Sequence, residues 1–290
     1  MLTGLCFLLF WMILEYAIGQ VSNQYSYKYN YIKNNPSIKT LLIGHSHFAD
    51  GINPYLMGDS VFDFATSGRG WLYFDVKLAE QLYPTMPNLK TVIFPLSYAV
   101  PYESPHYKEI DEGMKIRLYV YSKYMHVPYD IFPQKYIYSS ALICNQLGLS
   151  CWLKQSVDSL GYEKRLGKTT NWQYMHNINP DIFKGDTATL CYKEYKNYLI
   201  DLAKICYDNN IRFIAVTCPC ADCYIANTRQ VGIDNLYALV DSVRAQYPIE
   251  YKNYMNDPEF RADSLYYNSS HLNSIGADLF AIRVKKDFDL

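Results

Sequence analysis

The stretch Thr40-Leu-Leu-Ile-Gly-His-Ser-His-Phe48 is a short apolar run that stops at a glycine and then presents a serine between two histidines. An apolar run of this length predicts a buried strand, and the glycine predicts the turn that ends it. A second stretch, Asn268-Ser-Ser-His-Leu-Asn273, carries a histidine in a polar loop close to the C-terminus. A serine hydroxyl becomes a good nucleophile only when a base lies within hydrogen-bond reach. A fold that unites Ser46 and His271, which are 225 positions apart, would therefore create an acyl-transfer site.

Strand-like and helix-like segments alternate along most of the chain. Strands are predicted at 39–43, 60–65, 90–96 and 211–217, and helices at 71–83, 190–209, 235–246 and 274–286, the last with Asn273 as its N-cap. This alternation predicts an α/β fold, a three-layer α/β/α arrangement of the flavodoxin-like kind around a mostly parallel sheet. Ligands bind beyond the carboxyl ends of the strands in such sheets. The polar segments 44–47, 66–68, 97–98 and 218–219 each follow a predicted strand, so we expect them to crowd one edge.

The first 20 residues differ sharply from the rest. They are almost entirely apolar, and their length approaches the ~20 residues that cross a bilayer. No lysine or arginine precedes this segment, which favours an uncleaved transmembrane anchor over a signal segment. A buried helix is the remaining alternative. With an anchor, we expect a membrane-attached protein whose catalytic domain lies outside the cytoplasm, in the periplasm or cell envelope.

The remaining residues divide into a connector and one domain. Residues 21–38 are polar and rich in Tyr and Asn, and they are interpreted as a connector. Residues 39–290 form the predicted α/β domain, in which the alternation fails between about 98 and 187. We expect a mainly helical insertion there, with a helix at 108–124, that lies over the carboxyl edge and shapes the substrate pocket.

Composition excludes one class of partner and leaves other questions open. The formal net charge is −1 and charged residues make up 19%, so no broad basic surface indicates nucleic-acid binding. The 30 tyrosines either fill the edges of the core or form platforms for sugar rings. Cys218, Cys220 and Cys223 are small residues after a strand, disulfide partners or metal ligands, and Cys144 with Cys151 could bridge a short loop.

Four segments, in chain order, resemble the sequence blocks of the SGNH hydrolases, the GDSL-like esterases and acyltransferases. Gly44-His45-Ser46 resembles the first block, which carries the nucleophile. Phe64-Ala-Thr-Ser-Gly68 is similar to the second, and Val92-Ile-Phe-Pro-Leu-Ser97 falls where the third belongs. Asn268-Ser-Ser-His271 resembles the last block and leads into a helix. The resemblance covers the chain from about residue 39 to the C-terminus outside the insertion.

The resemblance implies a role for each of these residues. Ser46 is the expected nucleophile and His271 the base, with Asn268 orienting the imidazole ring from three positions back. The backbone N–H groups of Ser46 and Gly68 and the hydroxyl of Ser97 are the expected oxyanion donors. The implied activity is a serine-dependent esterase or O-acyltransferase that needs no cofactor or metal. Its expected partner is an acylated carbohydrate or another small ester, with O-acetyl groups of an envelope or extracellular polysaccharide as the leading case.

The last and third blocks depart from the family pattern. Asn268 stands where the family has an aspartate, so the charge that stabilises an imidazolium is absent. In serine proteases that use a Ser-His-Asp triad, an Asp-to-Asn change lowers turnover by about 10⁴-fold. Asn268 can still offer its carbonyl oxygen to the ring, and Asp263 is an alternative orienter. In the third block, Ser97 falls where the family has an asparagine donor.

Two other functions remain open on the sequence alone. The neutral Asn268 and the Ser97 substitution are compatible with an SGNH-like protein that binds glycan with weak or no turnover. His45, His47 and Asp50 could instead form part of a metal-dependent hydrolase, because histidines two apart after a strand are common ligands.

Overall fold

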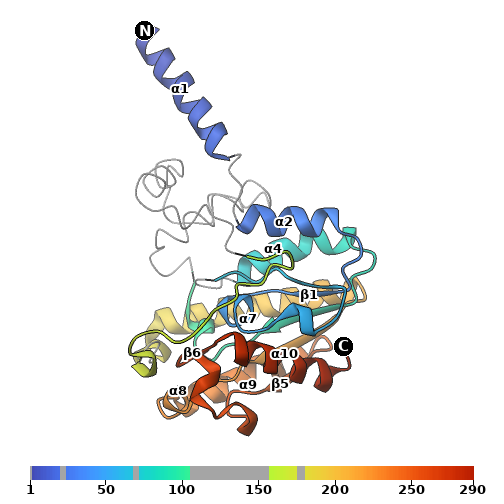
Figure 1. Ribbon diagram of the computed structural model, residues 1–290, viewed down its shortest axis with the longest axis vertical. Coiled ribbons are helices and arrows are strands. Elements are labelled where there is room, and N and C mark those ends of the chain that lie inside the picture. Colours follow the sequence, from blue (N-terminus) through green and yellow to red (C-terminus); the bar gives the residue numbers. More distant parts are fainter. Residues whose placement is uncertain (1, 20–23, 68–71, 105–156, 175–179) are drawn as a thin grey trace.

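The computed structural model describes residues 2–19, 24–67, 72–104, 157–174 and 180–290. At its centre lies a five-stranded sheet in the order β2-β1-β3-β4-β5, and all neighbouring strands are parallel (Figure 1). The strands are β1 (Thr40–Leu42), β2 (Val61–Asp63), β3 (Thr91–Pro95), β4 (Arg212–Thr217) and β5 (Glu250–Asn253). The predicted parallel α/β fold is therefore confirmed, and β5 is an additional edge strand.

The central strands are buried on both faces, as their near-continuous apolar sequences predict. Leu41 pairs with Phe62 on one side and with Val92 on the other. These three side chains belong to one apolar core, whereas Leu42, the next residue along β1, belongs to a second core. Successive side chains of a strand point to opposite faces, so helices must cover both faces of the sheet.

Among the described residues, four helices cover the first face. They are α2 (Gln24–Asn34), α4 (Leu72–Leu82), α7 (Gly185–Asp208) and α9 (Gln230–Arg244), and each contributes buried side chains to the first core. The second face is covered by α3 (Ser46–Ala49) and α10 (Ser274–Phe288). Asn273 caps α10 as predicted, because its side-chain oxygen accepts hydrogen bonds from the N–H groups of Ile275 and Gly276. Phe280 of α10 is completely buried.

The segment expected to be a connector contains a packed helix. Tyr25, Tyr29 and Ile32 of α2 are buried in the first core. Their spacing of four and three residues places them on one side of a helix, and burial of this stripe stabilises α2 despite its polar composition. The connector prediction for 21–38 is therefore wrong for Gln24–Asn34.

The N-terminal segment forms α1 (Leu2–Gly19), and its apolar side chains between Leu5 and Ile13 are largely exposed. Among the residues that the structure describes, no helix combines the length and apolar character required to cross a membrane. The transmembrane anchor expected at 1–20 is therefore not supported.

The described parts of the expected insertion contain no long helix. They hold only the 3-10 turns η3 (Val100–Tyr102), η6 (Trp172–Tyr174) and η7 (Pro180–Phe183), followed by the start of α7. The helix predicted at 108–124 lies outside the described residues. Residues 157–174, which we call the strap, contain no α-helix or strand. They contact the carboxyl end of β2, because the Leu160 carbonyl accepts a hydrogen bond from the Asp63 N–H at 2.9 Å.

The sheet has a topological switch point between β1 and β3. The chain moves outward from β1 to β2 and then returns to the other side of β1 to form β3. Ligands of open α/β sheets bind beyond the carboxyl ends of the strands at such a point. Ser46 lies there, because α3 begins only four residues after the end of β1.

Candidate active site

A glycine turn carries the chain from β1 to Ser46. Gly44 has φ = +106°, and a Cβ atom at this position would lie 2.6 Å from Cδ of Pro95. Only glycine fits this combination of positive φ and close approach without strain. The turn is held by two further contacts, because the Gly44 N–H donates to Asp75 Oδ1 at 3.1 Å and its carbonyl accepts from Thr66 N–H at 3.0 Å. The backbone before the serine is therefore fixed from the segments after β2 and at the start of α4.

Ser46 is the first residue of the short helix α3, and it is partly exposed. The preceding His45 is buried and caps this helix, since its Nδ1 accepts a 3.5 Å hydrogen bond from the His47 N–H. Phe48 and Ala49 anchor the helix in the second core. The helix is therefore anchored in the core and presents the serine hydroxyl outward.

His271 lies in a small antiparallel hairpin formed by β6 (Tyr266–Asn268) and β7 (His271–Leu272). The turn between the strands is held from both sides. The Ser269 N–H donates to the Trp172 carbonyl at 3.1 Å, and the Ser269 carbonyl accepts from Ala221 N–H at 3.0 Å. These contacts bring the C-terminal histidine to the same edge of the sheet as Ser46.

The two predicted catalytic side chains meet. Ser46 Oγ and His271 Nε2 are 2.8 Å apart, which lies within the 2.6–3.2 Å range expected for a nucleophile and its base. The ring's other nitrogen, Nδ1, is 3.0 Å from Asn268 Oδ1. The structure therefore joins Ser46, His271 and Asn268 in a linear hydrogen-bonded series.

The hydrogen bonds of Asn268 determine the tautomer of the histidine. Asn268 Oδ1 also accepts the backbone N–H groups of Ser270 at 3.1 Å and His271 at 3.0 Å, so this atom must be the amide oxygen. Because an acceptor faces Nδ1, the ring carries its proton there and Nε2 has a free lone pair. The Ser46 hydroxyl can then donate to Nε2, which is the arrangement that a general base requires.

The partners of His271 Nδ1 are both uncharged. Asn268 is buried and uncharged, so it orients the ring without offering a negative charge to an imidazolium. The hydroxyl of Ser270, also buried, lies 3.0 Å from His271 Nδ1 and gives the ring a second partner. A role for Ser270 was not predicted from the sequence, although its position next to the histidine was the available signal.

Of the two expected oxyanion donors besides Ser46, the structure describes only Ser97. Gly68 lies outside the described residues. Ser97 is buried two residues beyond β3, and its Oγ accepts a 3.4 Å hydrogen bond from Ala99 N–H, which leaves the hydroxyl proton available for donation. The oxyanion roles of Ser46, Gly68 and Ser97 remain predictions.

The alternative orienter and the metal alternative are not supported by the geometry. Asp263 is exposed, whereas Asn268 occupies the orienting position beside the ring. Within the described part of the chain, no three His, Cys, Asp or Glu side chains are grouped so that they could hold a metal ion. Asp50 is completely buried and forms an ion pair with Arg165. The proposed His45, His47 and Asp50 metal site is therefore not supported.

His47 does enter the site, but through ring contacts. Its imidazole packs edge-on against His45 and against His271, with 4.8 Å between ring centroids in each case. The His47 carbonyl faces the thiol of Cys218 at a sulfur–oxygen distance of 3.7 Å. His47 thus forms part of the wall beside the base.

The cysteines after β4 are packing residues. Cys218, Cys220 and Cys223 are all free thiols, and the first two are buried. Burial raises the pKa of Cys218 well above its ordinary value, which disfavours a reactive thiolate. This arrangement supports the interpretation of small residues at a strand end, while Cys144 and Cys151 lie outside the described residues.

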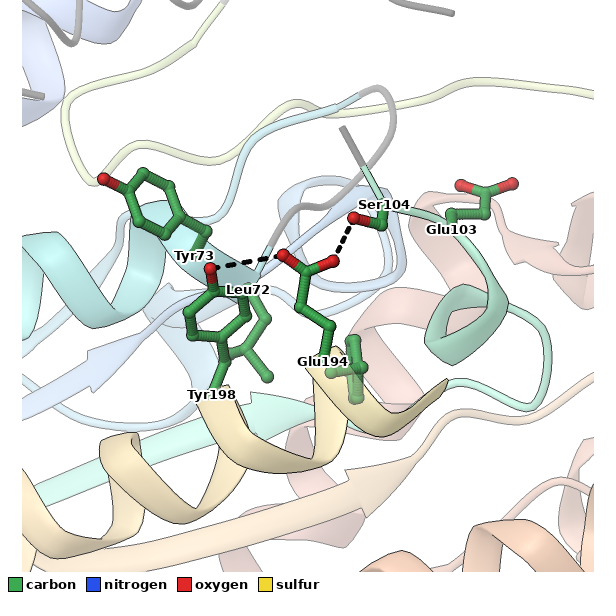
Figure 2. Close-up of a pocket in the computed structure, with 7 residues that line it drawn as sticks. Leu72, Tyr73, Glu103, Ser104, Glu194 and Tyr198 are labelled. Carbon is green, nitrogen blue, oxygen red and sulfur yellow. Dashed lines mark hydrogen bonds between the residues drawn. The ribbon is translucent and has the colours of Figure 1, made fainter. Parts of the chain in front are cut away.

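A second polar cluster lies between the beginning of α4 and the middle of α7. Figure 2 shows the Glu194 carboxylate there, which accepts hydrogen bonds from the Tyr198 hydroxyl at 3.3 Å and from the Ser104 hydroxyl. Leu72 and Tyr73 complete one wall of this small pocket. This cluster was not predicted from the sequence, because its members are far apart in the chain and form no motif.

Comparison with known proteins leaves the site to be interpreted on its own geometry. The sequence matches no protein-family model, and no curated protein matches it at a significant level.

Proposed function

We propose that this chain is a serine-dependent esterase or O-acyltransferase that belongs among the SGNH hydrolases. The observation that carries the proposal is the 2.8 Å contact between Ser46 Oγ and His271 Nε2, together with the orientation of that ring by Asn268. The strand order is also that of flavodoxin-like three-layer α/β/α folds, and the serine follows the first strand as it does in the SGNH family.

The proposed reaction begins with attack of Ser46 Oγ on the carbonyl carbon of an ester. His271 Nε2 takes the hydroxyl proton, and the carbonyl oxygen becomes an oxyanion in the tetrahedral intermediate. The C–O bond to the leaving alcohol then breaks, and His271 gives that alcohol its proton. Attack by water or by an acceptor hydroxyl on the acyl-serine, again with His271 as base, completes hydrolysis or transfer.

The neutral orienter predicts a slow enzyme rather than an inactive one. Asn268 fixes the productive tautomer, which is the function whose loss explains much of the cost of Asp-to-Asn changes in serine proteases. It does not supply the charge that would stabilise the imidazolium. Turnover should therefore be lower than in relatives with an aspartate.

The substrate class and the location are further parts of this proposal. We propose O-acetylated carbohydrate as the substrate, and the resemblance to SGNH enzymes supports that substrate class. We also propose an extracytoplasmic location, for which the apolar composition of the first 20 residues is the support.

The proposal is tested by hydrolysis of p-nitrophenyl acetate. We expect measurable turnover by the wild-type chain and a loss of at least about 10²-fold in Ser46→Ala and in His271→Gln. Ser242→Ala is the matched control, because the Ser242 hydroxyl donates to the Ala238 carbonyl within α9, away from the candidate site. Equal rates for Ser46→Ala and the wild-type chain would exclude the proposed chemistry.

A glycan-binding protein with little turnover is the second candidate, and the uncharged Asn268 is the observation that favours it. This alternative predicts binding of an O-acetylated oligosaccharide by calorimetry without release of acetate over many hours. Release of acetate that depends on Ser46 would exclude it.

A further inference from the structure

The strap, residues 157–174, touches each of the segments that build the candidate active site. The Glu163 N–H donates to the Ala49 carbonyl at 2.7 Å, at the end of the nucleophile helix α3. The Arg165 carbonyl accepts from Ser274 N–H at 2.8 Å, at the start of α10 after the histidine. The strap therefore links the nucleophile segment to the base segment.

One charged side chain of the strap, Arg165, contacts the same segments. The Arg165 guanidinium forms an ion pair through Nε with Asp50 Oδ2, directly after α3. Its Nη2 lies 3.4 Å from the Ser67 hydroxyl, next to the expected oxyanion glycine. Its Cζ atom lies 4.9 Å from the centre of the Tyr267 ring, beside Asn268 in β6. Arg165 thus contacts the flanks of the nucleophile, oxyanion and base segments at once.

The carboxylates around Arg165 are Asp50, its ion-pair partner, and Glu163. Asp50 is completely buried, and burial raises the pKa of its carboxyl group well above the ordinary value, while the charge of Arg165 opposes that rise. Glu163 accepts a 2.6 Å hydrogen bond from the same Ser67 hydroxyl that faces Arg165. The planar guanidinium can hold a carboxylate, a hydroxyl and an aromatic face in one geometry, which an ammonium group cannot.

We propose that Arg165 is a positioning residue that holds the Ser46 helix, the Ser67 turn and the Asn268 strand in the geometry needed for acyl transfer. This inference rests on the proposed function. Arg165 is separated from the reacting atoms by the residues it contacts, so its effect is on their placement. A displacement of about 1 Å in such a site is sufficient to lower turnover by about 10²-fold.

The test separates an effect of Arg165 on the placement of the catalytic residues from an effect on the stability of the fold. Arg165→Met leaves the buried Asp50 carboxylate without its cation, so it should lower both the melting temperature and kcat. The double variant Arg165→Met/Asp50→Asn removes that buried charge and should recover most of the melting temperature. Because the Ser67 and Tyr267 contacts remain lost, kcat for p-nitrophenyl acetate should stay at least about tenfold below the wild-type value, with KM changed less than about threefold.

The matched control is Arg261→Met/Asp222→Asn. Arg261 and Asp222 also form an Arg–Asp pair, with N–O distance 2.9 Å, but both side chains are at least half exposed. This control should keep the wild-type kcat. Full kcat in the Arg165→Met/Asp50→Asn variant would overturn the positioning role while leaving the proposed function intact. Failure of Ser46→Ala to lower the wild-type rate, measured in the same series, would overturn both.

Discussion

Replacing Asn268 with aspartate should make this site faster. In Asn268→Asp, a carboxylate oxygen would take the place of Oδ1, 3.0 Å from His271 Nδ1, and would accept the same backbone N–H groups of Ser270 and His271. Those two donors favour the ionised carboxylate even at this buried position. The variant therefore adds a negative charge beside the ring without changing its tautomer.

The size of the effect follows from the charge separation. Two unit charges ~4 Å apart interact by about 4 kcal/mol at an effective dielectric constant of about 20. The cost of burying the new carboxylate offsets part of this energy, because the position of Asn268 is only 2% exposed. The imidazolium exists only while the proton is on His271. The interaction energy left after the cost of burial therefore lowers the barrier to the reaction. We expect kcat/KM to rise by about 10-fold to 10²-fold, equivalent to about 1.4–2.7 kcal/mol.

The assay is hydrolysis of p-nitrophenyl acetate from mildly acidic to mildly alkaline pH. Besides the faster rate, the acidic limb of the kcat/KM profile should move to higher pH, because the new charge favours protonated His271. Asn35→Asp is the control for the added charge, since Asn35 bonds Ser37 before β1 and lies at the opposite edge of the sheet. A folded Asn268→Asp variant with an unchanged or lower rate and the same pH profile would refute this account of the site.

Three further predictions concern the scaffold. Gly44→Ala should lower the free energy of unfolding, measured by urea titration, by about 1–3 kcal/mol, because its Cβ would lie 2.6 Å from Pro95. Gly58→Ala is the control, since Gly58 has φ = +140° but nothing lies within 4 Å of the new Cβ, and it should lower the free energy of unfolding less. Equal losses in the two variants would count against the steric explanation. Burial raises the pKa of Asp63 from 3.8 to about 7. The folded state therefore binds the Asp63 carboxyl proton more tightly than the unfolded state does. Binding of this proton adds about 4 kcal/mol to the free energy of unfolding near pH ~4, and this stabilisation is lost as the pH rises to about 7. Asp63→Asn should remove that part of the pH dependence of urea unfolding, and an identical dependence in both proteins would contradict it. Phe280→Ala should cost about 3–5 kcal/mol, measured by thermal melting, because the ring is completely buried in the second core; a change below about 1 kcal/mol would disagree with the packing described.

The central part of the fold and of the site could be predicted because strong local signals agreed. Short apolar runs ended at polar turns, and parallel strands necessarily gather such turns at one edge. Ser46 follows this rule, whereas His271 lies in the separate β6-β7 hairpin. The two residues could be paired across 225 positions only because their segments resemble blocks of one family. Their contact in the structure agrees with that prediction.

The missed features are tertiary in origin. In α2 the stripe of Tyr25, Tyr29 and Ile32 is diluted by polar neighbours, so only its burial against the sheet reveals the helix. The edge strand β5, Glu250–Asn253, is mostly polar and pairs with a single neighbour. The Arg165–Asp50 pair joins residues more than a hundred positions apart and has no local signature.

The most direct test of the central claim is covalent labelling of the wild-type chain with a fluorophosphonate, followed by peptide mass spectrometry. Such reagents modify a serine whose proton a neighbouring base can take. We expect one dominant adduct, on Ser46, that disappears in His271→Gln. Absence of the adduct on Ser46, under conditions that label a control serine esterase, would contradict the claim that Ser46 and His271 work together.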